Sequence, residues 1–255
     1  MTEHLRVEEV DAIRLLTIDR PEAKNALNGP LLRGLRGAFT AADNDESVRV
    51  VVVTGVDPVF SAGVDYKQIE PGSADSGAQT GFNPASVLRA MRKPVICAVN
   101  GACVSGALEI ALSASFIVAS DRARFADTHA LLGVVPTWGL TALLPRAIGV
   151  RKARQMSVTG DFVDAQEALR LGLVNHVVSH EELLPFTLEL ARRIPGTGAV
   201  GEMLDLYGRG EGLPLAEALE LEGVHSAVRK YDRAAFTAAG RAAAARARSQ
   251  AADEH

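Results

Sequence analysis

Cysteine is scarce in this chain, which has only Cys97 and Cys103 among its 255 residues. Two cysteines six positions apart build neither a disulfide framework nor the ligand set of a metal site, so a reducing cytoplasm is the expected location. Positive charge is not in excess either, because the formal net charge is −4 and gives no basic field for nucleic acid. We therefore expect no metal site and no nucleic-acid partner.

The sequence also lacks an obvious membrane segment. Its first residues, MTEHLRVEEVD, carry mixed charge without an apolar core, unlike a signal peptide. Residues 101–120 are long and apolar enough to raise the question of a membrane span, but Glu109 stands near their middle and the strand-like FIVA lies near their end. A buried helix that runs into a buried strand explains this stretch better, so we expect no membrane contact.

Composition and length are those of a soluble globular protein. Hydrophobic residues make up 47% and charged residues 23% of the chain, which is ordinary for that class. A chain of this length can form one large domain, or one domain with a helical appendage.

Strand-like and helix-like segments alternate along the first half of the chain. Residues 5–18 resemble two strands around a turn near Asp11, and Asn28 is a suitable N-cap for a helix of about 14 residues. Further strands are predicted from apolar runs at residues 48–54, 94–99 and 116–119. This alternation predicts an α/β architecture with parallel strands.

The second half of the chain is predicted to be mostly helical from residue 141 onward. A short helix at residues 165–171 ends at Gly172, and residues 174–178 could add one more strand. Residues 215–251 are rich in alanine and arginine, which is typical of a helix. The arginines of this stretch are expected to form a solvated helix face. Alternatively, one or two of them touch ligand phosphates.

The stretch at residues 100–109, NGACVSGALE, is the most informative one. Its small residues, among them Gly106, follow a strand and open a helix, so backbone N–H groups there can approach a ligand closely. Glu109 is the only charge between residues 100 and 120. A carboxylate in apolar surroundings is a candidate for chemistry; alternatively, it is hydrogen-bonded to neighbouring backbone or turned to water.

A second turn of small residues lies at 60–65, FSAGVD. It is followed by residues 69–83, which are rich in Gly, Ser and Ala and are expected to form a surface loop of the kind that often serves as a lid or binding segment. Two small-residue turns at strand ends could present N–H donors that converge on one oxygen atom.

In combination, these segments resemble the crotonase (enoyl-CoA hydratase/isomerase) superfamily over about residues 5–240. Several motifs in the same order are more specific than any one of them. The matching segments are 20–28 (RPEAKNALN), 60–65 (FSAGVD), 93–96 (KPVI), 100–109, 125–136, 144–149 (LPRAIG), 171–174 (LGLV) and 235–236.

This resemblance implies the fold and the assembly. The expected fold class is α/β, a crotonase-like spiral of ββα units with a C-terminal helical region. The expected division is a core at residues 1–195 that holds an acyl-CoA site, and a helical region at residues 196–255. The family usually assembles as homotrimers or as dimers of trimers.

The resemblance also implies an acyl-CoA thioester as the ligand and assigns its contacts. The positions that match the two backbone donors for the thioester oxygen are Ala62 and Gly106. Glu109 matches the first of two catalytic glutamates. The residues expected to contact CoA or the acyl chain are Lys24, Ala26, Leu27, Ser61, Asp65, Tyr66, Lys67 and Trp138, although Lys67 could equally be a solvated lysine.

The sequence departs from the family pattern at the second glutamate, where it has His129. Asp127 lies two positions earlier, and in an extended segment both side chains would lie on one face. His129 could take over the proton-transfer role, since imidazole exchanges protons near neutral pH. Alternatively, Glu109 alone would make the protein a double-bond isomerase, or the protein binds acyl-CoA without turnover, with His129 as a packing residue.

Two further departures concern the acyl pocket and the tail. Trp138 stands where the family's hydratases favour small residues, so it would either fill part of the acyl pocket or belong to the core. Residues 240–252 lack the usual basic ending with proline, which puts a contact from this tail to CoA in doubt. The leading prediction is hydration of a 2-enoyl-CoA, with no metal or redox cofactor because CoA is part of the substrate.

Overall fold

The computed structural model describes residues 4–68, 83–230, 233–234, 236–241 and 243–244. The chain divides into two compact units, Met1–Asp205 and Leu206–His255, and the candidate site lies in the first. The surface loop expected at residues 69–83 falls outside the described residues except for Asn83. In the described part of the chain, no helix is long and apolar enough to cross a membrane.

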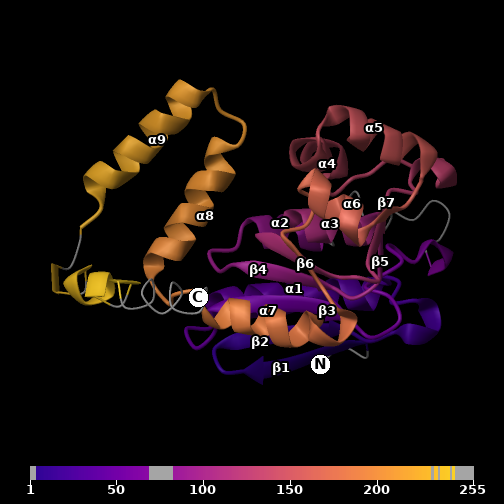
Figure 1. The fold of residues 1–255 in the computed structure, drawn as a ribbon, viewed down its shortest axis with the longest axis horizontal. Coiled ribbons are helices and arrows are strands. Elements are labelled where there is room, and N and C mark those ends of the chain that lie inside the picture. The colour runs from indigo at the N-terminus through magenta and orange to yellow at the C-terminus, as the bar shows by residue number, and fades with distance from the viewer. Residues whose placement is uncertain (1–3, 69–82, 231–232, 235, 242, 245–255) are drawn as a thin grey trace, which may run out of the picture. The chain divides into compact units, whose positions relative to one another are not determined.

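A six-stranded sheet in the order β1-β2-β3-β4-β6-β9 forms the centre of the first unit (Figure 1). β1 (Leu5–Val10) and β2 (Ile13–Ile18) are antiparallel around Asp11, which has a φ of 58°. All later neighbours pair in parallel, as the alternation of strands and helices predicts. These later strands are β3 (Val50–Gly55), β4 (Val95–Val99), β6 (Phe116–Ser120) and β9 (His176–Val178).

Helices bury both faces of this sheet. α1 (Gly29–Asn44) begins at Asn28, whose side chain accepts the N–H of Leu31 as predicted for an N-cap. Alternate residues of β3 belong to two different core clusters, one of which includes α1 residues and the other residues of α7 (Leu183–Arg192). A strand covered on both faces has no polar side, which explains the unbroken valine run of β3.

A second, three-stranded sheet in the order β5-β7-β8 was not predicted. Its strands are β5 (Ala102–Val104), β7 (Arg124–Ala126) and β8 (Val163–Asp164). Because β5 occupies residues 102–104, helix α3 (Gly106–Ser113) begins only at Gly106 and not directly after β4. Bridge pairing of Cys103 with Ser61 brings the two small-residue turns together.

The remaining helices of the first unit lie between or after these strands in the chain. α2 (Pro84–Arg89) lies between β3 and β4, and α6 (Ala165–Leu171) ends at Gly172 in the left-handed conformation, as predicted. α4 (Leu140–Ile148) and α5 (Val150–Thr159) lie between β7 and β8. α8 (Gly198–Gly210) crosses the division between the units, and α9 (Leu215–Val228) belongs to the second.

Candidate active site

The two small-residue turns touch each other at two glycines. A Cβ atom on Gly63, which has a φ of +88°, would lie 2.7 Å from the carbonyl oxygen of Val104 and 3.3 Å from the nitrogen of Gly106. A Cβ atom on Gly106 would lie 3.0 Å from Cγ2 and 3.5 Å from the nitrogen of Val64. The approach is close enough that the backbone of residues 63–64 lies against the start of α3.

The structure corrects the prediction that Ala62 supplies an N–H donor to a ligand. The N–H of Ala62 donates to the carbonyl oxygen of Lys24 at 3.0 Å. Gly63 and Asp65 both bond to the backbone of Leu27, through Leu27 N to Gly63 O at 2.8 Å and Asp65 N to Leu27 O at 3.0 Å.

The N–H group of Val64 therefore points away from Leu27, since bonding directions alternate along an extended chain. Within the described residues, the structure records no acceptor for this N–H. Val64 therefore replaces Ala62 as the candidate donor.

Gly106 keeps the place that the sequence predicts for it. It is the first residue of α3, and the first backbone bond of the helix runs from Glu109 N to Ser105 O. The N–H groups of a first helical turn have no partner inside the helix. Ser105, just before α3, has a φ of 49°. Its N–H donates to Ala126 O at 2.9 Å, and its hydroxyl is hydrogen-bonded to Thr128 Oγ1 at 2.8 Å. The role of Gly106 as a donor stays a prediction.

Glu109 lies three residues further along α3 and is only 2% exposed. Its Oε1 accepts the backbone N–H groups of Trp138 at 2.6 Å and Leu140 at 3.2 Å. Burial raises the pKa of this carboxyl, and the two N–H groups and His129 offset only part of that effect. One carboxylate oxygen of Glu109 is thus hydrogen-bonded to backbone, as one alternative from the sequence predicts. The other oxygen faces His129.

His129 approaches Glu109 through its outer ring nitrogen, with 3.8 Å between His129 Nε2 and Glu109 Oε2. Its other nitrogen, Nδ1, lies 2.6 Å from Oδ1 of Asp127, which also accepts the His129 backbone N–H at 3.1 Å. A carboxylate in this position requires the proton on Nδ1, which leaves Nε2 for exchange with Glu109 or a ligand.

Asp127 is almost fully buried, at 1% exposure. Burial, the largest single effect, would raise the pKa of its carboxyl, but hydrogen bonds from His129 and Ser157 together with the electrostatic attraction of His129 outweigh burial and lower that pKa. The two side chains lie close together as predicted, but the predicted reason, an extended segment, is wrong. β7 ends at Ala126, and His129 has helical dihedral angles (φ −56°, ψ −45°). A tight turn, and not strand alternation, brings the two side chains together.

Trp138 is buried, and its backbone N–H donates to Glu109. Its indole Cζ3 would lie 3.2 Å from a Cβ atom on Gly106, and its carbonyl oxygen accepts from Arg89 at 2.8 Å. The indole thus lies against the start of α3 and belongs to the larger core cluster, in line with the core alternative. That Trp138 also narrows an acyl pocket stays a prediction.

The residues predicted to contact CoA fall into two groups. Lys24, Tyr66 and Lys67 are exposed and Ala26 is half-buried, so a ligand can reach their side chains. The side chains of Leu27 and Ser61 are fully buried, and Ser61 Oγ accepts the N–H of Gly63 at 3.1 Å. The carboxylate of Asp65 is engaged by Arg20. Contacts of these residues with CoA stay predictions.

The residues that the structure adds to the candidate site contact it mainly through the backbone. Val64 lies inside the motif FSAGVD, but the direction of its N–H depends on pairing with Leu27. The Leu140 N–H and the Thr128 hydroxyl carry no sequence signal of their own. Arg20 belongs to the segment RPEAKNALN, which does mark the loop as important.

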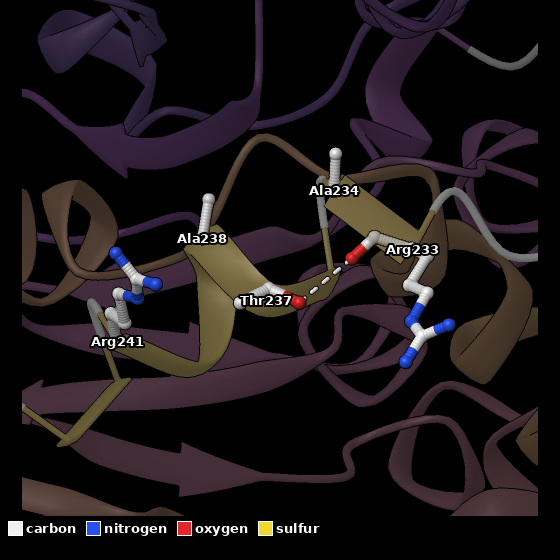
Figure 2. Close-up of a pocket in the computed structure, with 5 residues that line it drawn as sticks. All are labelled: Arg233, Ala234, Thr237, Ala238 and Arg241. Atoms are coloured by element: carbon white, nitrogen blue, oxygen red, sulfur yellow. Dashed lines mark hydrogen bonds between the residues drawn. The ribbon is translucent and has the colours of Figure 1, made fainter.

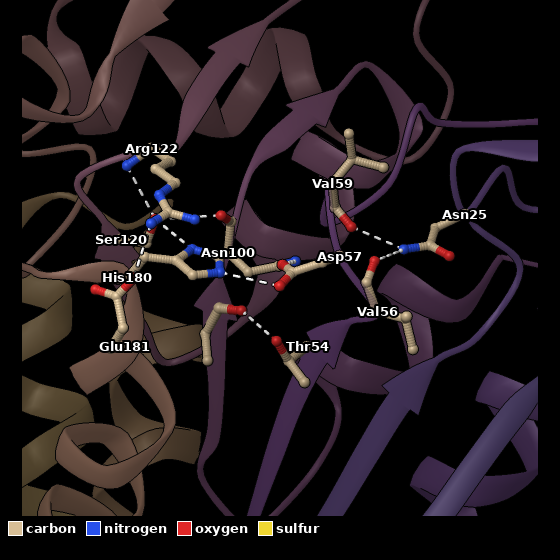
Figure 3. A network of polar contacts seen from close by, with 11 residues as sticks. Asn25, Thr54, Val56, Asp57, Val59, Asn100, Ser120, Arg122, His180 and Glu181 are labelled. Carbon is tan, nitrogen blue, oxygen red and sulfur yellow. Dashed lines mark hydrogen bonds and ion pairs between the residues drawn. The ribbon is translucent and has the colours of Figure 1, made fainter.

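A second histidine–aspartate pair lies where β3, β4 and β6 end (Figure 3). His180 Nε2 lies 3.0 Å from Asp57 Oδ2, and His180 Nδ1 lies 3.3 Å from Ser120 Oγ. This order of serine, histidine and aspartate resembles a nucleophilic triad. Ser120, however, is fully buried and its hydroxyl donates to Asn100 O at 3.1 Å, so it is not available to a substrate.

The second unit contains a surface hollow (Figure 2) lined by two of the C-terminal arginines and by none of the site residues predicted in the first unit. Its lining residues are Arg233, Ala234, Thr237, Ala238 and Arg241. No group of three or more His, Cys, Asp or Glu side chains placed to hold a metal ion occurs among the residues that the structure describes.

Comparison with known proteins finds relatives of this chain. A family model described as enoyl-CoA hydratase/isomerase matches residues 8–205. The crotonyl-CoA hydratase of Syntrophomonas wolfei is 38% identical over 215 residues, which are 83% of each chain. A carnitinyl-CoA dehydratase of Salmonella arizonae is 40% identical over 197 residues, or 76% of this chain and 75% of the relative.

Solved structures agree. An enoyl-CoA hydratase from Mycobacterium smegmatis matches with a TM-score of 0.71 and 43% identity, over 88% of this chain and 94% of that one. A putative enoyl-CoA hydratase from Streptomyces coelicolor matches with a TM-score of 0.84 and 30% identity, over 94% and 92% of the two chains. These likenesses confirm the fold class that the motifs predict.

Proposed function

The chain belongs to the enoyl-CoA hydratase/isomerase family, and from this premise we propose that it adds water to the double bond of a 2-enoyl-CoA thioester. The observation that supports hydration most is the approach of two proton-carrying groups, with His129 Nε2 3.8 Å from Glu109 Oε2. Hydration needs one group to activate water and another to protonate Cα. The relatives named as hydratases point to the same reaction.

The thioester oxygen is received by the N–H groups of Val64 and Gly106. Negative charge grows on this oxygen when water attacks Cβ, and fixed N–H donors stabilise it by roughly 2.7–4 kcal/mol each. Support comes from the contact between the two turns, where a Cβ atom on Gly106 would lie 3.5 Å from the Val64 nitrogen. The N-terminus of α3 adds its dipole to the same oxygen.

Glu109 and His129 divide the proton transfers. The Glu109 carboxylate takes a proton from water as the water oxygen bonds to Cβ, and the His129 imidazolium delivers its Nε2 proton to Cα. Asp127 orients the imidazole ring through its bond to Nδ1. After the reaction, the proton on Glu109 returns to His129 across the gap between Oε2 and Nε2, which restores both groups. The cycle requires no metal or redox cofactor.

The proposal is tested by the loss of enoyl-thioester absorbance with crotonyl-CoA and longer 2-enoyl-CoAs. Wild type should hydrate at least one of them, and Glu109→Gln should lower kcat by about 10²–10⁴-fold. Glu189→Gln, on the exposed side of α7, is the matched control. A wild type that binds acyl-CoA but leaves the absorbance unchanged contradicts hydration. Conversion of a 3-enoyl-CoA would then identify an isomerase, and its absence a binding protein.

The assembly and setting of the protein are further parts of this proposal. We infer a homotrimer or a dimer of trimers in the cytoplasm, acting in fatty acid metabolism. Leu131, Leu132, Val134 and Val135 are exposed around η3 (Ala130–Leu132), and such apolar surface favours contact with other subunits. Light scattering after gel filtration should give three or six times the chain mass, and a monomer would contradict the assembly.

A further inference from the structure

A buried ion pair joins the two loops that flank the candidate donor of Val64. Arg20 Nη1 lies 2.6 Å from Asp65 Oδ2, and the side chains are only 11% and 10% exposed. Asp65 directly follows Val64 in the chain. We propose that the Arg20–Asp65 pair is a positioning device that fixes the direction of the Val64 N–H, an inference that rests on the proposed function.

The arginine side of this device is anchored in a loop with little freedom. Asn25 is fully buried, and its side-chain oxygen accepts the Arg20 backbone N–H at 2.9 Å. Its amide nitrogen donates to the carbonyl oxygens of Val56 and Val59, both at 2.7 Å. The Arg20 guanidinium also donates to Ala26 O at 3.1 Å. Arg20 is therefore held at its backbone and at its head group.

The aspartate side controls the peptide that carries the donor. The backbone of residues 62–65 is tied to the loop by three hydrogen bonds, from Ala62 N to Lys24 O, from Leu27 N to Gly63 O and from Asp65 N to Leu27 O. The ion pair adds a side-chain tie directly after Val64. Rotation of the peptide between Gly63 and Val64 would strain this tie and the bond from Leu27.

The physical reason for placing a charge pair here is geometric. A buried ion pair gives little net stability, because desolvation of the two charges offsets their attraction, but it can select one conformation over others. Donors to an oxyanion act at 2.7–3.1 Å, and a displacement of about 1 Å can cost 10²-fold in rate. The pair is positioned to prevent such a displacement.

The experiment compares Arg20→Lys and Asp65→Asn with a matched control, Arg14→Lys. Arg14 pairs with Asp45 at 2.8 Å and its side chain is 13% exposed, but it lies at the start of β2 and takes no part in the site. Steady-state hydration gives kcat and KM for each variant, and thermal unfolding monitors the fold. If Asp65→Asn does not fold, Arg20→Lys, which keeps the charge, carries the test.

A second readout reports the donor itself. Hydrogen bonds to a conjugated thioester carbonyl shift its absorbance to longer wavelength, so bound 2,4-hexadienoyl-CoA measures how well the donors are placed. This shift is measured with each variant in the Glu109→Gln background, where the ligand is not consumed. A residue with only a structural role would leave the shift of the folded protein unchanged.

We expect Arg20→Lys and Asp65→Asn to lower kcat by about tenfold or more, short of the 10²–10³-fold loss caused by removing a donor. KM should change little, and the absorbance shift should shrink, while Arg14→Lys leaves kcat and the shift unchanged. A full shift, with loss of activity only through KM or unfolding, overturns the inference. A wild type that gives the shift without hydration refutes the proposed reaction alone, and a wild type without any shift refutes the donor pair and its positioning together.

Discussion

Two histidines of this chain are each paired with an aspartate, and we propose different roles for the two pairs. His129 Nδ1 lies 2.6 Å from Asp127 Oδ1, and His180 Nε2 lies 3.0 Å from Asp57 Oδ2. The histidine side chains are similarly buried, at 13% and 15% exposure. Pairing and burial of the histidine therefore do not distinguish the pair that we propose to be catalytic from the other pair.

What separates them is the group that the second ring nitrogen faces. His129 Nε2 faces a carboxylate, Glu109, whose Oε2 accepts none of the backbone N–H groups that bind Oε1. His180 Nδ1 faces the hydroxyl of Ser120, which already donates to Asn100 O and accepts the N–H of Arg122 at 2.9 Å. A histidine whose second ring nitrogen faces a hydroxyl that is already hydrogen-bonded to other groups can stabilise the fold. A histidine whose second ring nitrogen faces a carboxylate can exchange a proton with it.

The largest effect that would sharpen this comparison is on turnover. His129→Ala should lower kcat for 2-enoyl-CoA hydration by about 10²–10⁴-fold, because it removes the group that protonates Cα. His180→Ala should leave kcat nearly unchanged and lower the thermal midpoint instead. Equal losses of kcat in both folded variants would contradict the division into one catalytic and one structural pair.

The aspartates should differ in the same direction by a smaller amount. Asp127→Asn leaves the imidazole in place but removes the charge that holds the proton on Nδ1, so we expect kcat to fall by about 10–100-fold, as for other partners that orient a functional histidine. The pH–rate profile should also change shape, which loss of packing alone would not cause. Asp57→Asn, whose side chain is 62% exposed, should change neither.

Much of the fold could be predicted because it is encoded locally. The β-branched run of β3 and the Asn28 cap of α1 are short-range signals that the structure confirms. β5 was missed because its three residues form a strand only by pairing with β7, more than 20 positions later in the chain.

The candidate site follows the same rule. The motifs correctly indicated the two turns, yet they gave Ala62 as the donor where the structure favours Val64. The direction of each peptide is set by the pairing of Leu27 with Val64, which links loops that are 37 positions apart in the chain. Sequence likewise brought Asp127 and His129 together, but by strand alternation, whereas a turn after β7 does so. Long-range pairing and turn geometry are the parts that pattern alone does not carry.

The smallest expected effects concern Ser120 and Glu109, the groups that the second ring nitrogens of His180 and His129 face. Substitution of these two residues should change the stability of the protein in opposite directions. Ser120→Ala should destabilise the protein by about 1–3 kcal/mol, because a buried hydroxyl with three polar neighbours is lost and partners remain unsatisfied. Urea unfolding at neutral pH measures this change.

Glu109→Gln should instead stabilise the protein at neutral pH, and the sign follows from its raised pKa. A carboxyl that holds its proton more tightly in the folded than in the unfolded state makes stability fall as pH rises from about 4.3 toward the folded pKa. Glutamine cannot ionise and still accepts the N–H groups of Trp138 and Leu140, so this loss disappears. Urea unfolding of wild type and variant between pH 4 and 7 should show a gap that widens with pH in favour of the variant. A constant gap, or one that closes, would mean that burial of Glu109 imposes no cost on its charge, and the case for a proton-carrying role beside His129 would lose its electrostatic basis.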